Sequence, residues 1–395
     1  MTALAEPTIR LERWLFDEAL PLWWTLGADH QRGGFHEAID LHGRPTATHR
    51  RVRVQARQTF VYATAGLWGW RGPWRAAVDH GLDYQQTRYL RHCGLVRGSV
   101  DAEGAPIDDS AMLYDQAFVL LAIAAAFRAV PSRIDLPGRA HSLLGALDAA
   151  FRHDDRGFRE ASADHPFHAD PHMHLLEAAL AWSEVSSDRA WPLLADSLAE
   201  LALASFIDPE AGAIREYLAS NWRAAAGQVG RIFEPGHQFE WAGLLRTWGK
   251  ARGRRDALDA AARLFRVGSR FGIDRVRGVA FHSMGGDLCP LNRTARLWPQ
   301  TEWIKAAVVF GADARDETEQ AALLAEALSA VDGLQLFLNS PVRGAWRDKL
   351  TSEGVFLEEP APASSIYHVI GAIRALSTRR QAVLAKTSLA GGVKQ

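Results

Sequence analysis

The sequence has few cysteines and none of the common nucleotide-binding motifs. Its two cysteines, Cys93 and Cys289, lie far apart and form no CxxC pair, which argues against a disulfide framework and against a thiolate zinc site. The chain has no GxGxxG sequence, no phosphate-binding loop and no GxSxG sequence. It therefore gives no support to a dinucleotide enzyme, a nucleoside triphosphatase or a nucleophile-elbow hydrolase.

The sequence also lacks an excess of charge of one sign and long apolar runs. Lys and Arg number 45 against 46 Asp and Glu, so the chain has no general field for a polyanion and we expect no nucleic-acid partner. It contains no uncharged run of about 18 residues and no basic segment followed by an apolar segment at its start, so we expect neither a membrane span nor a signal peptide. These features predict a cytoplasmic protein.

Helical periodicity dominates what is present. Apolar residues recur at the spacing of buried helical stripes rather than of strands. We predict about twelve helices, with boundaries uncertain by a few residues, at 8–26, 53–70, 74–91, 111–129, 133–151, 171–185, 188–205, 235–250, 254–271, 298–310, 315–332 and 363–387. These helices fall into pairs.

A glycine turn followed by a short extended stretch separates the pairs. It recurs about every 55 to 66 residues, at Gly34, Gly94, Gly157, Gly212, Gly278 and Gly344. A repeat of this length holds two helices and a hairpin. An open solenoid and a closed ring both fit such a unit, but six units favour closure because every inner helix is then buried between two neighbours. We predict an all-α fold, an (α/α)6 barrel with short β-hairpins at one mouth.

We expect one domain over residues 1–395, with a frayed tail at 387–395. No linker, low-complexity tract or charge block interrupts the series of repeats. In such a barrel the hairpins gather at one mouth, so polar residues at the starts of inner helices converge on one pocket. The function should lie there.

Two polar clusters mark predicted starts of inner helices. In Glu234-Pro235-Gly236-His237-Gln238-Phe239-Glu240-Trp241, the proline suits the first helical turn, so His237, Glu240 and Trp241 should share one face. Asp170 followed by Pro171 predicts a helix N-cap. His174 and Glu177 can share a face, and we expect His174 rather than His172 to point into the pocket.

Further candidates lie at four other positions along the chain. Arg53 and Arg57 are neighbours on a helix and either pair with carboxylates or hold substrate oxygens. Tyr114, the segment from Trp298 to Trp303, and His368 also stand at predicted helix starts. Aromatic walls with imidazoles between them suit the binding of a sugar.

The spacing of His237 and Glu240 is also that of part of a zinc motif. The sequence nevertheless has no HExxH, and a site built from His and carboxylate ligands needs three or four converging groups. We therefore predict a site without a metal.

Six motifs follow one another along the chain: RVRVQARQ (51–58), YDQAF (114–118), DPHMHLLEA (170–178), EPGHQFEW (234–241), RLWPQTE (296–302) and YHV (367–369). In these motifs and in their order, the chain resembles the N-acylglucosamine 2-epimerase superfamily over nearly its whole length. The resemblance implies an (α/α)6 barrel that epimerises sugars at C2 or interconverts aldoses and ketoses, without metal or nicotinamide. RLWPQTE is similar to the D-mannose isomerase and sulfoquinovose isomerase branch.

The resemblance also implies roles for individual residues. His237 and His368 would be the acid/base pair, Arg57 would hold substrate oxygens, and His174 with Glu240 would assist ring opening or hold the open chain. The implied pocket groups are Tyr114, Trp298, Glu302 and Trp303. Asp170 stands where relatives often have Asn, so it either contacts substrate or only caps the helix.

We therefore expect a cofactor-independent aldose–ketose isomerase that interconverts D-mannose and D-fructose through a cis-enediolate, because histidine titrates near neutral pH. A 2-epimerase of the mannose/glucose, N-acylglucosamine or cellobiose type is the first alternative. A glycoside hydrolase with Glu240 and Glu302 as its carboxylates and a non-catalytic sugar-binding protein are the others. The expected partner is a monosaccharide, and the protein is expected to be a monomer or homodimer.

Overall fold

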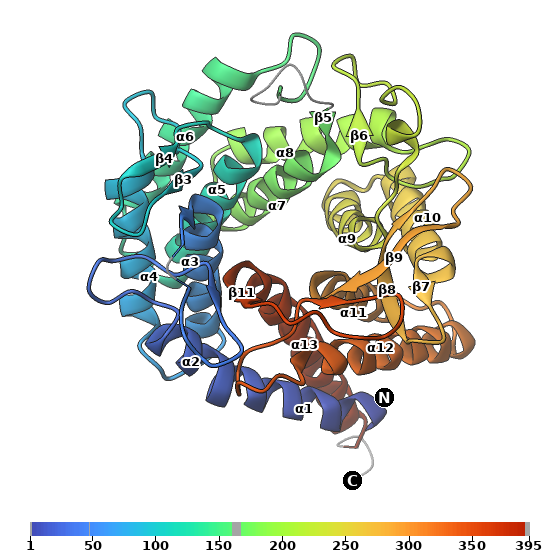
Figure 1. Ribbon diagram of the computed structural model, residues 1–395. Coiled ribbons are helices and arrows are strands. Elements are labelled where there is room, and N and C mark those ends of the chain that lie inside the picture. Colours follow the sequence, from blue (N-terminus) through green and yellow to red (C-terminus); the bar gives the residue numbers. More distant parts are fainter. Residues whose placement is uncertain (1, 47, 160–166, 392–395) are drawn as a thin grey trace.

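The helices form a closed ring of pairs, with one helix of each pair facing the centre (Figure 1). The computed structural model describes residues 2–46, 48–159 and 167–391. Residues 160–166, which include Glu160 of the third predicted turn, lie outside that range, as do residues 392–395 of the predicted frayed tail. Residues 387–391 of that tail belong to the last helix, which runs to Gly391 rather than to residue 387.

Six inner helices line the centre of the ring. Each packs against the next, and the last packs against the first. The inner helices are α3 (Val52–Leu67), α5 (Leu113–Ala129), α7 (Ala169–Val185), α9 (Pro235–Arg252), α11 (Leu297–Gly311) and α13 (Ile366–Gly391). The α5 helix is apolar on nearly every side, as expected for a helix covered all round. The prediction of a closed ring rather than an open solenoid is confirmed.

An outer helix covers each inner helix. The outer elements are α1 (Ala5–Arg13) with α2 (Leu20–Thr25), α4 (Trp74–Tyr84), α6 (Asp135–Phe151), α8 (Ala190–Leu201), α10 (Arg255–Phe271) and α12 (Glu317–Leu338). Three of them contain or end in π-helical turns, at 14–19, 85–89 and 202–206. By length and composition alone α12 could cross a membrane, but it packs along α11 as an outer helix of the ring.

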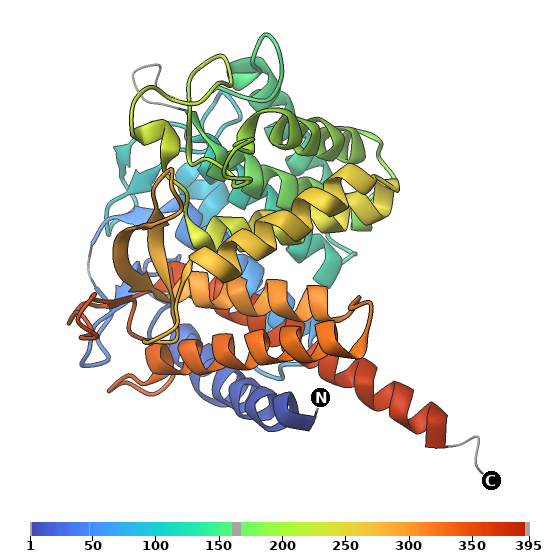
Figure 2. The ribbon, with the colours of Figure 1, turned by 90° about the vertical axis from the view of Figure 1, so that its right-hand side faces the viewer.

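Short strands connect neighbouring repeats at one end of the barrel, the left-hand end in Figure 2. They are β1 (Ala38–Ile39), β2 (Arg50–Arg51), β3 (Ser99–Val100), β4 (Pro106–Asp108), β5 (Phe167–His168), β6 (Tyr217–Leu218), β7 (Ile273–Asp274), β8 (Val279–Met284), β9 (Pro290–Arg296), β10 (Lys349–Leu350) and β11 (Ala361–Pro362). The sheets are antiparallel, in the orders β1-β11, β2-β3-β4, β5-β6 and β10-β9-β8-β7. Pairing of β1 with β11 joins the first repeat to the last.

The six turn glycines all have the left-handed backbone conformation, with φ between 65° and 86°, which only glycine adopts without strain. Just after the turn, a side-chain amide from the next inner helix clamps the backbone. Gln55 accepts from the N–H of Phe35 at 2.6 Å and donates to its carbonyl at 2.8 Å. The same double contact joins Gln116 to Val96, Gln238 to Ile214, and Gln300 to Ala280. The clamp fixes each hairpin to the start of an inner helix.

The third repeat uses a histidine for the same purpose. His172 is fully buried, and its Nε2 accepts the N–H of Phe158 at 3.2 Å. This contact fixes the rotation of α7 about its axis. His174, two residues further on, then faces the centre of the barrel, as predicted.

Candidate active site

A cavity of about 290 Å³ opens at the mouth where the hairpins gather. It is lined by the starts of inner helices and by the strands that precede them. Its lining residues are Arg51, Arg53, Arg57, Tyr114, Asp170, His174, Glu234, His237, Glu240, His282, Arg296, Trp298, Ser364, Ser365 and His368. Acids, bases and hydrogen-bond donors from all six repeats therefore meet at one place.

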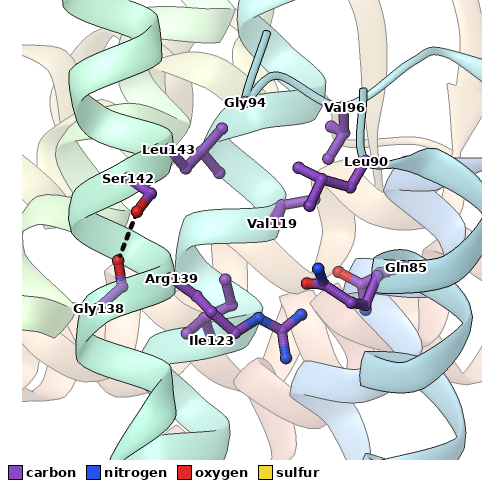
Figure 3. Close-up of a pocket in the computed structure, with 11 residues that line it drawn as sticks. Gln85, Leu90, Gly94, Val96, Val119, Ile123, Gly138, Arg139, Ser142 and Leu143 are labelled. Carbon is purple, nitrogen blue, oxygen red and sulfur yellow. Dashed lines mark hydrogen bonds between the residues drawn. The ribbon is translucent and has the colours of Figure 1, made fainter. Parts of the chain in front are cut away.

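Another cavity, of about 340 Å³, lies between the π-helical turn that follows α4 and the helices α5 and α6 (Figure 3). Its wall is mostly apolar and includes Leu90, Val119, Ile123 and Leu143, with Arg139 as its charged group. It lacks the paired acids and bases of the central cavity. Acid/base chemistry is therefore assigned to the centre of the barrel.

His237 lies in the first turn of α9, just after the N-cap residue Glu234 and Pro235. Its Nδ1 is 2.6 Å from Oε2 of Glu216, a residue of the neighbouring hairpin. Burial alone would lower the pKa of His237, but the charge and hydrogen bond of Glu216 outweigh it, so the pKa is raised well above the ordinary value. His237 is therefore a protonated imidazolium near neutral pH.

His368 lies in the first turn of α13 and has the opposite protonation state. Its Nδ1 is 2.8 Å from Oε1 of Glu302. Burial lowers the pKa of His368 to about 4, although Glu302 opposes this shift. The neutral ring donates its Nδ1 hydrogen to Glu302, which leaves the lone pair on Nε2 available as a base.

Trp298 lies beside both imidazoles. Its ring centroid is 4.9 Å from that of His237 and 5.6 Å from that of His368, with interplanar angles of 36° and 39°. The indole contributes an apolar wall beside a proton donor and a proton acceptor. A sugar that packs a C–H face on this ring can present its polar atoms to both histidines.

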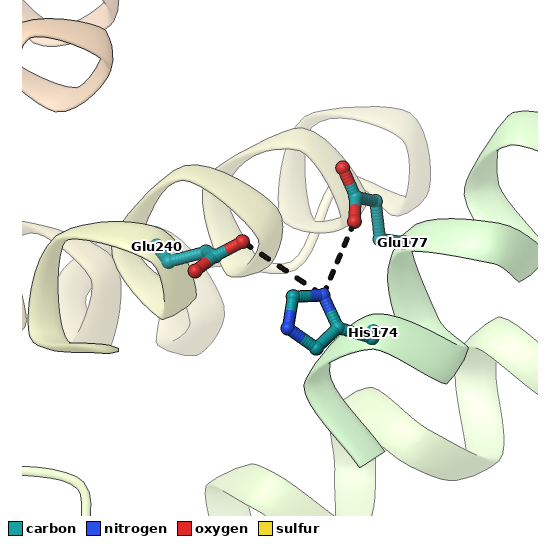
Figure 4. Close-up of side chains that lie close together, drawn as sticks. All are labelled: His174, Glu177 and Glu240. Atoms are coloured by element: carbon teal, nitrogen blue, oxygen red, sulfur yellow. Dashed lines mark hydrogen bonds and ion pairs between the residues drawn. The ribbon is translucent and has the colours of Figure 1, made fainter. Parts of the chain in front are cut away.

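His174 is buried among carboxylates (Figure 4). Its Nε2 is 3.1 Å from Asp170, and its Nδ1 is 3.4 Å from Glu177 and 3.9 Å from Glu240. Burial would lower the pKa of His174, but the hydrogen bonds with Asp170 and Glu177 raise it to about 9. His174 therefore carries a positive charge near neutral pH, and it lowers the pKa of Asp170, which burial would raise.

Glu240 is a buried carboxyl group whose nearest charged neighbour is His174, at 3.9 Å. Neither of its oxygens has a hydrogen bond to any residue that the structure describes. Burial and the nearby charge of Glu302 raise the pKa of Glu240 to about 8. Glu240 is therefore a neutral acid near pH 7, able to donate a proton into the cavity.

Arg57 projects from α3 into the cavity beside Tyr114. One of its terminal nitrogens, Nη2, is 2.5 Å from the Tyr114 hydroxyl, and Nη1 is 3.4 Å from the carbonyl of Ser364. Arg57 has no ion pair among the described residues, whereas Arg53 is held by Asp115 at 2.7 Å. Of the two arginines, Arg57 keeps donors for substrate oxygens and Arg53 is structural.

The structure brings most of the predicted site residues together and corrects four expectations. Trp303 does not line the cavity, because its indole N–H donates outward to Glu326 of α12 at 2.9 Å. Trp241 does not share the pocket face of His237 and Glu240, since it is fully buried against Phe206. The apolar wall is Trp298 instead.

The third correction concerns Asp170, which is not a helix cap. The α7 helix begins one residue earlier, at Ala169, and His168 occupies the N-cap position. The carboxylate of Asp170 is instead turned toward His174, inside the cavity. The fourth correction concerns Glu302, which was expected as a pocket group but does not line the cavity and instead contacts His368 from behind, with its side chain fully buried.

Several residues of the site escaped the sequence analysis, chiefly Glu216, Glu234 and His282. Glu216 and His282 each stand two residues after the backbone position that a glutamine clamps, Ile214 or Ala280. Side chains two residues apart on an extended segment share a side. The repeated turn therefore carried a signal for both residues.

Three groups of side chains have the donor types and closeness that a metal ion requires. Their ligand atoms lie within 4.8 Å of one another in each of the sets His174, Glu177 and Glu240; Glu216, Glu234 and His237; and Glu240, Glu302 and His368. Imidazole with carboxylate suits zinc and similar ions. The expectation of a site without metal stays a prediction.

Known proteins resemble the chain in sequence. The sequence model of the N-acylglucosamine 2-epimerase family matches residues 33–372. A mannose-6-phosphate isomerase from Rhizobium meliloti (strain 1021) is 46% identical over 367 residues, which cover 92% of this chain and 95% of that protein. A D-mannose isomerase from Thermobifida fusca is 30% identical over 338 residues, or 77% of this chain and 79% of that protein.

Solved structures share the fold. The crystal structure of a D-mannose isomerase has a TM-score of 0.82 at 21% identity and covers 94% of this chain and 97% of its own. The cellobiose 2-epimerase from Bacillus thermoamylovorans B4167 also has a TM-score of 0.82, at 16% identity, with coverages of 95% and 99%. The (α/α)6 barrel predicted from the six repeats is confirmed.

Proposed function

Because the chain belongs to the N-acylglucosamine 2-epimerase family, whose members are sugar isomerases and epimerases, we propose that it is a cofactor-independent isomerase of D-mannose and D-fructose. One observation carries the proposal. His237 and His368 line a single cavity beside Trp298, and Glu216 keeps the first imidazole protonated while burial keeps the second neutral. Aldose–ketose isomerisation needs such an acid and such a base.

In this mechanism His368 removes the proton from C2 of the open-chain aldose, and His237 donates a proton to the carbonyl oxygen O1. The product of this step is a cis-enediol. His368 then returns its proton to C1, while the hydroxyl on C2 gives its proton back to His237 and becomes the ketose carbonyl. Arg57 holds the oxygens on which negative charge develops.

The substrate ring must open before this transfer, which requires a proton on the ring oxygen. Glu240 supports this role, since the raised pKa keeps its carboxyl group protonated and its oxygens have no hydrogen bond within the described chain. His174 lies 3.9 Å from Glu240 and supplies the positive charge that stabilises the carboxylate once the proton has left.

The charges at the mouth favour an uncharged sugar over a sugar phosphate. Three of the lining arginines are already neutralised by carboxylates: Arg51 by Glu37 at 2.6 Å, Arg53 by Asp115 at 2.7 Å and Arg296 by Asp348 at 3.1 Å. Arg57 is balanced within the same cavity by Asp170, whose lowered pKa keeps it ionised. The mouth offers fixed hydrogen-bond donors without the excess positive charge that a phosphate dianion requires.

The proposal is tested by incubating the protein with D-mannose in D₂O, with EDTA present, and following the products by NMR. Fructose that carries deuterium or the transferred hydrogen at C1 supports the isomerase. Mannose 6-phosphate is tested for comparison. Faster turnover of mannose 6-phosphate than of D-mannose would contradict the argument from charge. Binding of mannose without any product would leave a sugar-binding protein as the explanation.

A 2-epimerase is the second candidate. Both imidazoles line the same cavity and contact Trp298, so an intermediate within reach of both could lose its proton to one ring and regain it from the other. Glucose labelled at C2 as the first product in the same experiment would favour this activity.

A further inference from the structure

Glu177 and Tyr367 lie beneath the active-site cavity and have no task in the proposed reaction steps. Neither lines that cavity. Both line another one, of about 600 Å³, together with residues such as Thr247 and Val308 from the second halves of α9 and α11. Because the inner helices begin at the mouth of the active site, this far-end cavity lies at the opposite end of the barrel. Glu177 and Tyr367 therefore stand between the two cavities.

The carboxylate of Glu177 is held by a tyrosine from a different inner helix. Its Oε2 accepts a hydrogen bond from the hydroxyl of Tyr367, which belongs to α13, whereas Glu177 belongs to α7. Tyr367 is buried, and its ring centroid lies 5.2 Å from that of Phe60 and 5.3 Å from that of Phe118. This packing fixes the tyrosine ring, so the hydroxyl holds Glu177 in one orientation.

The imidazole of His174 has a carboxylate at each of its nitrogens. Nε2 lies 3.1 Å from Asp170, and Nδ1 lies 3.4 Å from the same Glu177 oxygen that Tyr367 contacts. Nδ1 also lies 3.9 Å from Glu240 (Figure 4). Turning the ring over would put carbon atoms where the nitrogens stand and would lose these contacts. Glu177 and Asp170 therefore keep the Nδ1 edge of the ring directed toward Glu240.

The charge of Glu177 acts in the same direction as its position. Burial would raise the pKa of Glu177, but the hydrogen bond and charge of His174 lower it, so the carboxylate is ionised near neutral pH. Burial and Glu302 do most to raise the pKa of Glu240, and the charge of Glu177 adds to them. Glu177 thus favours the two states that ring opening requires, a charged imidazole and a protonated Glu240.

We propose that Glu177, fixed by the hydroxyl of Tyr367, is a positioning residue that holds the His174 imidazolium against Glu240 for opening of the sugar ring. The inference rests on the proposed function only for the ring-opening step. This step can be measured alone, because the interconversion of α-D-mannose and β-D-mannose passes through the open chain and needs no hydrogen transfer between C2 and C1.

The test follows the conversion of freshly dissolved α-D-mannose into the β-anomer by NMR at pH 7, with full-length protein. Glu177→Gln should reduce the acceleration by at least about tenfold and Tyr367→Phe by at least about threefold, with the KM for D-mannose within twofold of wild type. Glu184→Gln, at an ion pair on the surface of α7, and Tyr62→Phe, which removes a buried hydroxyl outside both cavities, are the matched controls and should keep the wild-type rate.

The double variant separates positioning from a general loss of packing. If the hydroxyl of Tyr367 acts through Glu177, then Glu177→Gln with Tyr367→Phe should lose no more than Glu177→Gln alone. Losses that multiply would overturn the proposal, as would single variants within twofold of wild type or a wild-type protein that does not accelerate the interconversion. Reduced acceleration in the variants, with no fructose formed even by wild type, would refute the isomerase and leave the positioning role intact.

Discussion

Nδ1 of His368 lies 2.8 Å from Oε1 of Glu302, and the other carboxylate oxygen of Glu302 lies 2.7 Å from Nζ of Lys305. Burial would raise the pKa of Glu302, but the charge of Lys305 and the hydrogen bond with His368 lower it to about 2. The carboxylate therefore stays ionised and accepts a hydrogen bond from the ring. This contact fixes both the orientation of His368 and the nitrogen that carries its hydrogen.

Glu302→Gln should lower kcat by about 10²–10⁴-fold with little change in KM, because an amide that donates to Nδ1 places the ring hydrogen on Nε2 and removes the base. The rates are measured with D-mannose at pH 7. Glu326→Gln is the matched control, since Glu326 accepts the indole N–H of Trp303 outside the cavity. A Glu302→Gln enzyme within threefold of wild type would remove this contact from the mechanism.

The two histidines predict a broad plateau in the pH dependence of kcat/KM. Activity should fall as pH drops through about 4, because His368 then becomes protonated. At the alkaline end it should fall as pH rises through about 8, where Glu240 loses the ring-opening proton, and again where His237 loses its proton, well above the ordinary pKa of histidine. The profile is measured from pH 4 to 10 under conditions where the protein stays folded.

Glu216→Gln should move the alkaline limb of this profile to lower pH, because it removes the charge that raises the pKa of His237. Glu37→Gln is the control, as Glu37 pairs with Arg51 in the first hairpin, and the limb should keep its position. An alkaline limb unmoved by Glu216→Gln would show that His237 is not the group that titrates there.

The glutamine clamps predict a stability effect separate from catalysis. Gln238→Ala leaves the buried N–H and carbonyl of Ile214 without their side-chain partner, which should cost about 2–4 kcal/mol in the free energy of unfolding. Urea denaturation gives the value. Gln228→Ala, at an exposed position, should change it by less than about 0.5 kcal/mol. Equal effects from the two substitutions would contradict the clamp.

The repeat made the fold and much of the site predictable from sequence. Six turn glycines at similar spacing required six equivalent units, and ring closure then placed polar helix starts such as those of His237 and His368 at one mouth. Helix spacing fixes which residues share a face, but it does not state which face points inward. The family resemblance implied both Trp298 and Trp303 in the pocket, and only Trp298 lines it.

The protonation states lay beyond the reach of sequence spacing. His368 receives its carboxylate from 66 residues away and His237 receives its own from 21 residues away. Whether an imidazole is acid or base depends on these distant partners and on burial. In the sequence the two histidines are equivalent, and only the three-dimensional contacts distinguish them.

Glu240 makes a last prediction, which joins stability to catalysis. Its raised folded-state pKa, about 8 against an ordinary value near 4.3, means that the folded protein holds this proton more tightly than the unfolded chain. The contribution to stability is therefore lost as pH rises from about 4.3 to about 8, and above that range the folded state carries a buried charge at full cost.

Glu240→Gln removes this cost. The melting temperature of the variant should equal that of wild type at pH 5 and exceed it by at least about 2 °C at pH 9. The variant should also turn over mannose more slowly. Glu319→Gln, which alters an exposed carboxylate paired with Arg315, should show no alkaline gain. Melting of Glu240→Gln at or below wild type at pH 9 would mean that Glu240 is already ionised and stabilised near neutral pH, and would exclude it as the proton donor in ring opening.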